Sequence, residues 1–317
     1  MKRLFTSLIA ASLAISAAHA QTPSCAAPGD NNAFLGIETI RLWPGTPPEA
    51  KGNTCDDIPT LTLFETRKGT ETGSAVIILP GSSYLRLAGD LEGREVANWF
   101  TARGFRAFIL SYRLSSNGYL LPVPLLDARR AIQTVRARAL DYHINPKRIV
   151  VIGFSAGGHL AALAGTQFTQ GNPDADDPIE RASSRPDYLV LGYPWLDAIS
   201  SDTTYLSYCK LFNLMDQCDA LRARFDPVLY VSKDTPPTFI YHTFPDKTAS
   251  VEPSLQFYAA LVKAGVPSEL HIFANGAHGS GLGNGDPALD QWPNLLETWL
   301  RAHELLTVDK AAVGATP

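Results

Sequence analysis

The chain has 317 residues, of which 27 are Lys or Arg and 31 are Asp or Glu. This length suits one large α/β core and is too short for two full-sized catalytic domains, so we expect a single domain. The net charge is mildly acidic and the chain contains no run of basic residues, which argues against nucleic acid or another polyanion as a partner.

The first twenty residues have the features of an export signal. Lys2 and Arg3 precede an apolar run that ends at Ala17, and Ala18 and Ala20 place small residues at the two positions that a signal peptidase reads. We expect cleavage after Ala20. The apolar run is shorter than the roughly 20 residues that span a bilayer, so no membrane anchor should remain after cleavage. The mature protein should be secreted or periplasmic.

The rest of the chain predicts an α/β fold. Residues 21–73 are rich in Pro, Gly, Thr and Asn, and their two strand-like runs, Glu38–Trp43 and Thr60–Glu65, should form an antiparallel sheet edge. Residues 74–308 should form the catalytic domain, because short apolar runs alternate there with stretches of helical period, the pattern of a mostly parallel sheet flanked by helices on both faces. The expected strands are Ala75–Leu79, Phe105–Ser111, Ile149–Phe154, Tyr188–Leu191, Thr238–His242 and Glu269–Phe273, and the expected helices are Glu92–Arg103, Pro124–Leu140, Ala156–Thr166, Val251–Ala264 and Gln291–Leu306.

Two segments stand apart from this alternation. The connection from about Asp197 to Asp234 is too long for a simple crossover, so it is a candidate lid over the active site. Residues 309–317 should form a disordered tail.

All four cysteines lie beyond the signal, where an oxidising compartment would pair them. Three pairings are possible. We expect the local ones, Cys25 with Cys55 and Cys209 with Cys218. The spacings fit no common zinc pattern, so no metal site is expected.

The pentapeptide Gly153-Phe154-Ser155-Ala156-Gly157 has the pattern Gly-X-Ser-X-Gly. A β-branched strand runs directly into it and a helical stretch follows Ser155, which is the context of a nucleophile elbow. Small neighbours let the serine occupy a sharp strand-to-helix turn, and the helix N-terminus then directs free N–H groups at a developing oxyanion. We therefore expect Ser155 to be a nucleophile, in preference to a structural residue of a glycine-rich turn.

A serine nucleophile needs a base, and the base needs an orienting carboxylate. In this fold class the acid and then the histidine follow the serine along the chain. His278, in a glycine-rich loop after the last expected strand, is the predicted base, and His242 is expected to be a packed strand-end residue. Asp246 is the predicted carboxylate, with Asp197 as the alternative.

The oxyanion hole requires two backbone N–H groups. Ala156 is expected to provide the first, from the start of the elbow helix. The second should come from Ser82 or Ser83, in the loop after the first parallel strand.

These motifs resemble those of the secreted bacterial esterases of the α/β-hydrolase superfamily, the acetyl xylan esterases and related carbohydrate esterases. The resemblance extends from about Ala75 to Leu300 and departs from the family at Ser82-Ser83, where the family loop reads Pro-Gly-Gly-Gly-Tyr. A positive φ there would strain a serine or rearrange the loop. The matching residues are Pro80–Tyr84, Glu92-Gly93, Ser111–Leu114, Asp127 with Ala128 and Arg130, Gly153–His159, Gly192–Pro194, Asp234–Phe239, Asp246 with Val251-Glu252, and Gly276–Gly279.

The resemblance implies a serine carboxylesterase that uses no cofactor and removes short acyl groups, acetyl foremost, from plant cell-wall polysaccharides or oligosaccharides. Ser155 would attack the ester, His278 would move the proton and Asp246 would orient His278. The first alternative is a lipophilic short-chain or feruloyl esterase of the same fold, and the second is a non-catalytic binding relative.

The partner is therefore expected to be an acylated carbohydrate or a small ester, and the sequence leaves the oligomeric state open. Four aromatic residues are candidates to stack on sugar rings, of which Tyr84 and Trp195 are the expected substrate-binding pair. The other two are Tyr205 and Trp292.

Overall fold

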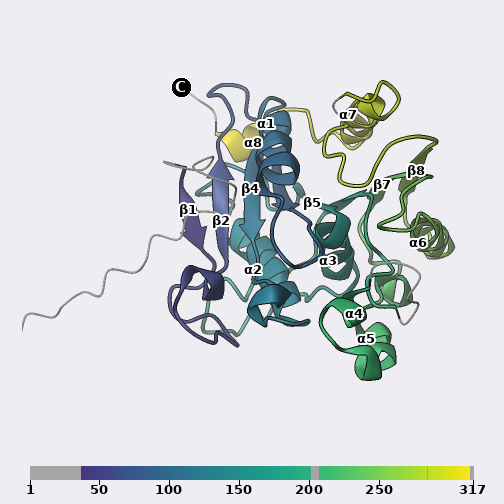
Figure 1. Ribbon diagram of the computed structural model, residues 1–317. Coiled ribbons are helices and arrows are strands. Elements are labelled where there is room, and N and C mark those ends of the chain that lie inside the picture. The colour runs from purple at the N-terminus through teal and green to yellow at the C-terminus, as the bar shows by residue number, and fades with distance from the viewer. Residues whose placement is uncertain (1–36, 201–206, 284, 315–317) are drawn as a thin grey trace, which may run out of the picture.

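The computed structural model describes residues 37–200, 207–283 and 285–314, and within them the chain forms one eight-stranded sheet (Figure 1). The strand order is β1-β2-β4-β3-β5-β6-β7-β8. β2 runs antiparallel to both β1 and β4, whereas the six strands β4, β3, β5, β6, β7 and β8 run parallel to one another. The bounds are β1 Thr39–Arg41, β2 Thr60–Phe64, β3 Ala75–Leu79, β4 Arg106–Ser111, β5 Ile149–Phe154, β6 Tyr188–Gly192, β7 Thr238–Thr243 and β8 Ser268–Phe273.

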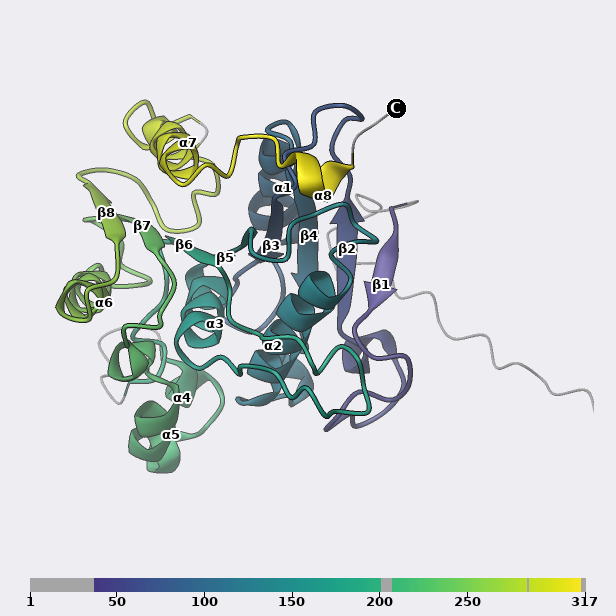
Figure 2. The same ribbon diagram turned by 180° about the vertical axis from the view of Figure 1, so that it is seen from behind.

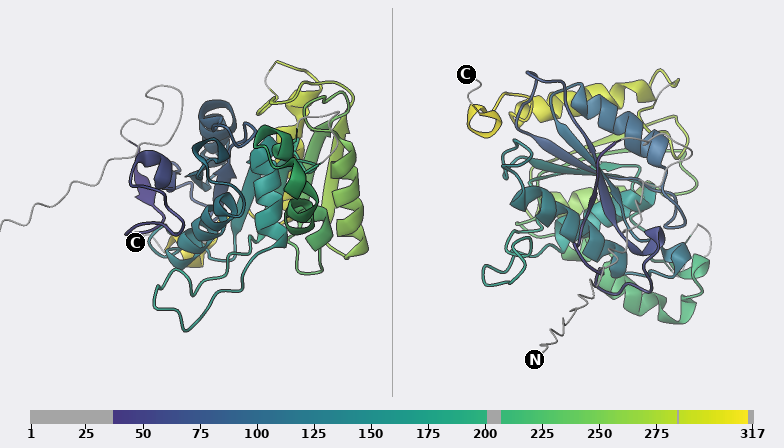
Figure 3. Two further views of the ribbon diagram at one scale, coloured as in Figure 1. Left: turned by 60° about the horizontal axis from the view of Figure 1, so that its bottom comes forward. Right: turned by 90° about the vertical axis from the view of Figure 1, so that its left-hand side faces the viewer.

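Helices cover both faces of the sheet, which confirms the predicted α/β class (Figures 2 and 3). Successive residues of a strand point to opposite faces, so Ile77 packs in one core with α2, α3 and α6, whereas Ile78 packs in the other with α1 and α7. The helices are α1 Glu95–Thr101, α2 Val123–Ala137, α3 Ser155–Thr166, α4 Tyr208–Leu211, α5 Cys218–Phe225, α6 Glu252–Lys263, α7 Trp292–Ala302 and α8 Lys310–Val313.

The parallel register places the carboxyl ends of the central strands at one edge of the sheet. Leu79 at the end of β3 lies opposite Gly153 of β5, which lies opposite Leu191 of β6. The loops that follow β3, β5, β7 and β8 therefore leave the sheet at the same edge, the position at which α/β folds bind their ligands.

The expected strands and helices are present, with ends that differ by a few residues. One difference precedes α1, where residues Gly89–Arg94 form a π-helical segment whose end is marked by the bond from Glu95 N–H to Asp90 O. The predicted disordered tail is wrong for residues 309–314. The Asp309 carboxylate caps α8 by accepting from Ala311 N–H, and it also accepts from the side-chain amide of Asn145.

The long connection after β6 contains α4, α5 and short 3₁₀ turns at Met215–Gln217 and Pro227–Tyr230. The predicted Cys209–Cys218 disulfide is present and joins α4 to α5. The other predicted pair, Cys25 with Cys55, involves a residue outside the described part, as does the predicted signal at residues 1–20. No helix in the described ranges is long and apolar enough to cross a membrane.

Candidate active site

Ser155 lies at the sharp turn between β5 and α3, with a φ of 51°. This left-handed conformation is costly for a residue with a side chain, and it persists because the neighbouring backbone leaves no alternative. A Cβ on Gly153 would collide with the carbonyl of Gly157, and a Cβ on Gly157 would collide with the carbonyl of Leu79. The glycines of the pentapeptide are therefore required by the close approach of backbone segments.

Ser155, His278 and Asp246 form a continuous hydrogen-bonded chain across three loops. His278 Nδ1 lies 2.7 Å from Asp246 Oδ2, and His278 Nε2 lies 2.7 Å from Ser155 Oγ. An ionised carboxylate can only accept, so Nδ1 carries the imidazole proton and Nε2 is free to accept from the serine hydroxyl. This is the arrangement in which the imidazole can remove the hydroxyl proton. The carboxylate in contact with His278 is Asp246, as predicted, and not the alternative Asp197.

Asp246 is held in place by three hydrogen-bond donors. Its Oδ1 accepts from the backbone N–H groups of Thr248 and Ala249, and its Oδ2 accepts from His278 Nδ1. His242 Nε2 also lies 3.4 Å from Oδ2. Burial acts to raise the pKa of Asp246, but the neighbouring imidazoles of His242 and His278 hold that pKa well below its ordinary value. Asp246 is therefore ionised at neutral pH.

His242 is fully buried at the end of β7, as expected for a packed strand-end residue. Its Nε2 donates to the carbonyl of Ala249 at 3.0 Å, and its Nδ1 lies 2.9 Å from Ser254 Oγ. Both ring nitrogens are engaged, so His242 supports the turn that contains Asp246 and does not approach Ser155.

The loop after β3 lies directly against the nucleophile. A Cβ on Gly81 would lie 2.8 Å from the Cβ of Ser155 and would collide with the carbonyl of Phe154. The next two residues have positive φ angles, 111° at Ser82 and 57° at Ser83, so both serines occupy conformations that favour glycine. Within the described residues, neither serine's backbone N–H is engaged in a hydrogen bond to the protein.

Three hydrogen bonds fix the shape of this loop. Tyr112 O–H donates to the carbonyl of Pro80 at 2.7 Å, and the carbonyl of Tyr84 accepts from the backbone N–H of Ser115 at 3.1 Å. The third bond joins the hydroxyl of Tyr84 to Nδ1 of His159, 2.9 Å away in α3. The loop is thereby tied to the elbow helix that bears Ser155.

His159 is a structural residue of the elbow helix. Burial lowers its pKa to about 4, so the ring is neutral at pH 7. Its Nε2 lies 2.9 Å from the carbonyl of Phe225 in α5 and must donate there, which leaves Nδ1 to accept from Tyr84. One neutral imidazole therefore links the loop after β3 to the end of α5.

The prediction that Tyr84 and Trp195 stack on sugar rings is wrong. Tyr84 is 0 % exposed and Trp195 is 2 % exposed, so neither ring offers a face to a substrate. Tyr84 points inward to His159, and Trp195 packs in the core that contains α3. Trp292 is also buried, and Tyr205 lies outside the described residues.

Two residues of the site have no role in the predictions from sequence. Glu92 is buried, with Oε2 accepting from the backbone N–H of Gly81 at 2.7 Å and Oε1 accepting from the hydroxyl of Tyr193 at 2.8 Å. The ring of Tyr193 packs edge-on against the imidazole of His278, with centroids 5.0 Å apart. The sequence did contain a signal for both residues, because each lies in a motif shared with the family that the chain resembles, Glu92-Gly93 and Gly192–Pro194. These motifs did not show that the two side chains are in contact.

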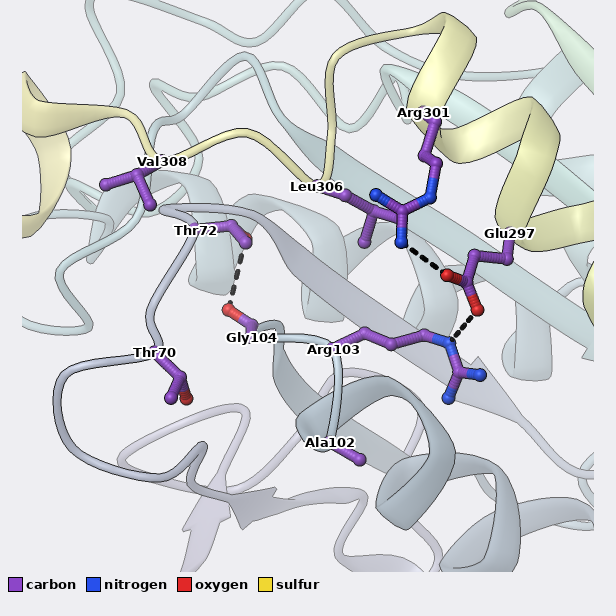
Figure 4. A pocket seen from close by; sticks show the side chains of 9 residues that line it. All are labelled: Thr70, Thr72, Ala102, Arg103, Gly104, Glu297, Arg301, Leu306 and Val308. Atoms are coloured by element: carbon purple, nitrogen blue, oxygen red, sulfur yellow. Dashed lines mark hydrogen bonds and ion pairs between the residues drawn. The ribbon is translucent and has the colours of Figure 1, made fainter.

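A separate cavity of about 450 Å³ lies at the other edge of the sheet (Figure 4). Its lining includes Thr72 and Gly104, which precede β3 and β4, and an ion-pair cluster in which Glu297 lies between Arg103 and Arg301. The carboxylate already neutralises part of the guanidinium charge, and no residue of the Ser155 site lines this cavity. It is distinct from the hydrolytic centre.

Comparison with known proteins finds a family and individual relatives that are similar to this chain. The profile of the BD-FAE family matches residues 61–261. The chain is 31% identical over 214 residues to "Endo-1,4-beta-xylanase B" of Butyrivibrio fibrisolvens, covering 66% of this chain and 33% of that protein. It is 28% identical over 243 residues to "Acetylxylan esterase" of Xylanibacter ruminicola, covering 73% of this chain and 46% of that protein. The chain thus spans a third to a half of the length of these relatives.

A solved structure resembles the whole fold more completely. The acetyl ester-xyloside bifunctional hydrolase from Caldicellulosiruptor lactoaceticus superposes with a TM-score of 0.75 at 36% sequence identity. The match covers 84% of this chain and 97% of that one.

Proposed function

Because the chain belongs to the BD-FAE family of α/β-hydrolases, we propose that it is a serine carboxylesterase that removes short acyl groups, acetyl foremost, from plant cell-wall polysaccharides or oligosaccharides. The observation that carries this proposal is the hydrogen-bonded chain from Ser155 through His278 to Asp246. The names of the relatives, which include an acetylxylan esterase and an acetyl ester-xyloside hydrolase, support the choice of acyl group and of sugar.

The proposed reaction has two half-reactions at Ser155. As Oγ attacks the ester carbonyl, His278 Nε2 takes the hydroxyl proton, and the imidazolium then donates it to the departing sugar hydroxyl. Water then attacks the acyl-enzyme carbonyl as it gives a proton to the same nitrogen, and Nε2 returns that proton to Ser155 Oγ as the bond to Oγ breaks and the carboxylic acid leaves. Asp246 keeps the proton on Nδ1 throughout, because its Oδ2 accepts there at 2.7 Å.

The oxyanion that forms in each half-reaction is bound by backbone N–H groups in this proposal. Ala156, the residue after the nucleophile, supplies one donor, and Ser82 or Ser83 supplies the other. A single such donor contributes about 2.7–4 kcal/mol to the transition state. The position of Gly81 against Ser155 supports this assignment, since it brings the following residues to the nucleophile.

We also propose that the protein is exported and acts outside the cytoplasm, in the periplasm or beyond the cell. The Cys209–Cys218 disulfide supports this location, because such bonds persist in oxidising compartments. The signal-like pattern in the first twenty residues supports it as well.

Acetate release tests the proposed function. Purified protein would be incubated with acetylated xylan and with acetylated xylo-oligosaccharides, beside a series of 4-nitrophenyl esters from acetate to octanoate, with Ser155→Ala as the blank. We expect acetate from the glycans and a rate that falls with acyl length. A preference for butyrate or longer chains, or for feruloyl esters, without acetate release from the glycans would contradict the proposed substrate.

A further inference from the structure

A buried carboxylate joins two loops of the site that are distant in sequence. Glu92 is 3 % exposed, and both of its oxygens accept hydrogen bonds. Oε2 accepts from the N–H of Gly81, immediately before the residues with positive φ, and Oε1 accepts from the hydroxyl of Tyr193, the residue that follows β6.

Tyr193 extends this connection to the loop that contains the histidine. Its hydroxyl oxygen accepts from the backbone N–H of Gly281 at 3.0 Å, three residues beyond His278. The carbonyl of Gly281 is fixed in turn by the hydroxyl of Tyr241 at 2.8 Å and by the indole N–H of Trp292 at 3.2 Å. The ring of Tyr193 also packs against the imidazole itself.

We propose that Glu92 is a positioning residue for the esterase reaction, which holds the oxyanion loop and the His278 loop in one fixed arrangement through Tyr193. The carboxylate accepts from Gly81 on one side and from Tyr193 on the other. A shift of the loop after β3 therefore breaks the bond to Glu92, and a shift of the His278 loop breaks the bond from Gly281 to the Tyr193 hydroxyl that Glu92 holds. The kinetic part of this proposal rests on the proposed esterase function, whereas the bridge between the two loops does not.

The chemistry of the bridge requires a carboxylate. Its two oxygens satisfy two donors, whereas a glutamine has one acceptor oxygen and an NH₂ group that only donates. With glutamine at this position, either the N–H of Gly81 or the hydroxyl hydrogen of Tyr193 faces a donor and stays unpaired in a buried site. Burial raises the pKa of Glu92, while the bonds from Tyr193 and Gly81 act in the opposite direction.

The local backbone also points to a specific role for Glu92. It lies in the π-helical segment Gly89–Arg94, and such segments occur frequently at functional sites. The extra residue in this turn precedes α1, and Glu92 and Gly93 are both buried in it. Gly93 packs near Pro80 and Ile109, so this part of the segment lies against the start of the loop after β3.

The test compares two bridge variants with a matched control. Glu92→Gln removes one acceptor at nearly constant shape, and Tyr193→Phe removes the hydroxyl that connects the two loops. The control is Asp187→Asn at the amino end of β6. Asp187 is likewise a largely buried carboxylate that accepts from a backbone N–H, that of Ile149 at 3.0 Å, and from one side chain, that of Arg136 at 2.8 Å.

Amide hydrogen exchange by mass spectrometry would follow the peptides that contain Gly81 and Gly281, and steady-state kinetics with 4-nitrophenyl acetate would give kcat and KM. We expect both peptides to exchange faster in each bridge variant. Glu92→Gln can remove a direct bond only from the Gly81 peptide, and Tyr193→Phe removes a direct bond only from the Gly281 peptide. We expect kcat to fall by about 100-fold with KM within threefold, because small displacements of catalytic groups cost about that much. Asp187→Asn should leave both peptides and kcat near wild type.

Faster exchange in only the peptide that lost its own hydrogen bond would overturn the bridge. The bridge would also be overturned if Asp187→Asn, with a melting temperature similar to that of the bridge variants, accelerated exchange in both peptides equally. A kcat within threefold of wild type in both bridge variants would overturn the positioning role. Absence of esterase activity in the wild type would contradict the proposed function, and the exchange result would still decide the bridge.

Discussion

Replacing Asp246 by asparagine should block proton transfer while keeping the shape of the site. The Oδ1 atom of Asp246 accepts from two backbone N–H groups, those of Thr248 and Ala249. These donors should hold the amide oxygen of asparagine in the same place. The NH₂ group then occupies the position of Oδ2, which lies 2.7 Å from Nδ1 of His278. An amide nitrogen only donates, so Nδ1 would have to accept and the imidazole proton would move to Nε2.

The expected loss follows from this change of tautomer. Nε2 then carries a proton and cannot accept the one from Ser155, whose oxygen lies 2.7 Å away. The corresponding substitution in serine proteases lowers kcat by about 10⁴-fold. Since each tenfold change is about 1.36 kcal/mol, this corresponds to about 5.4 kcal/mol of lost transition-state stabilisation. The new NH₂ group would also face Nε2 of His242, 3.4 Å away, which should lower the melting temperature slightly.

The assay is steady-state hydrolysis of 4-nitrophenyl acetate at pH 7.5, with circular dichroism to verify the fold. Asp197→Asn is the control, because Asp197 is the other carboxylate that the sequence offers and the hydrogen bond at His278 Nδ1 is made by Asp246. We expect Asp197→Asn to stay within threefold of wild type. The reasoning would be refuted if Asp246→Asn kept more than a tenth of the wild-type kcat, or if the two variants lost activity equally.

Three further predictions follow. Gly81→Ala should lower kcat by about 10²–10³-fold, as measured in the same assay, because its Cβ would meet that of Ser155 and displace the oxyanion loop. The folded-state pKa of Asp246 is depressed, so the ionised carboxylate stabilises the fold above its unfolded-state pKa of about 3.9, and this stabilisation is lost as the pH falls. In urea unfolding between pH 3 and 7, the free energy of unfolding of Asp246→Asn should therefore fall less steeply toward low pH than that of the wild type. Replacing Cys209 and Cys218 by serine should lower the free energy of unfolding by about 2–3 kcal/mol, since the disulfide closes a loop with a sequence separation of 9. Urea titration measures this loss, and a smaller loss would contradict the prediction.

Much of the site could be predicted because its signals are local or follow chain order. The pentapeptide around Ser155 lies between a β-branched strand and a helical stretch, so the elbow is specified by neighbours in sequence. The choice of His278 and Asp246 relied on loop position after β8 and β7, and the structure brings both side chains to Ser155.

Other features depend on contacts between distant segments. An acidic residue near the start of a helix is normally exposed. Glu92 is buried because it accepts hydrogen bonds from Tyr193 and Gly81, which are distant in sequence from each other. The direction in which Tyr84 and Trp195 point is likewise a tertiary property, and both rings face inward. The short helix near the C-terminus could have been predicted, because Asp309 immediately before Lys310–Val313 is a helix-capping signal present in the sequence.

Labelling with a fluorophosphonate tests most directly whether Ser155 is a nucleophile activated by His278. Peptide mapping should find a single adduct, on the peptide that contains Ser155. The adduct should be absent from Ser155→Ala and should form at least about 10³-fold more slowly in His278→Ala, because the hydroxyl is a poor nucleophile without its base. A folded wild-type protein that stays unlabelled, or that is labelled at another residue, would contradict the assignment of this site.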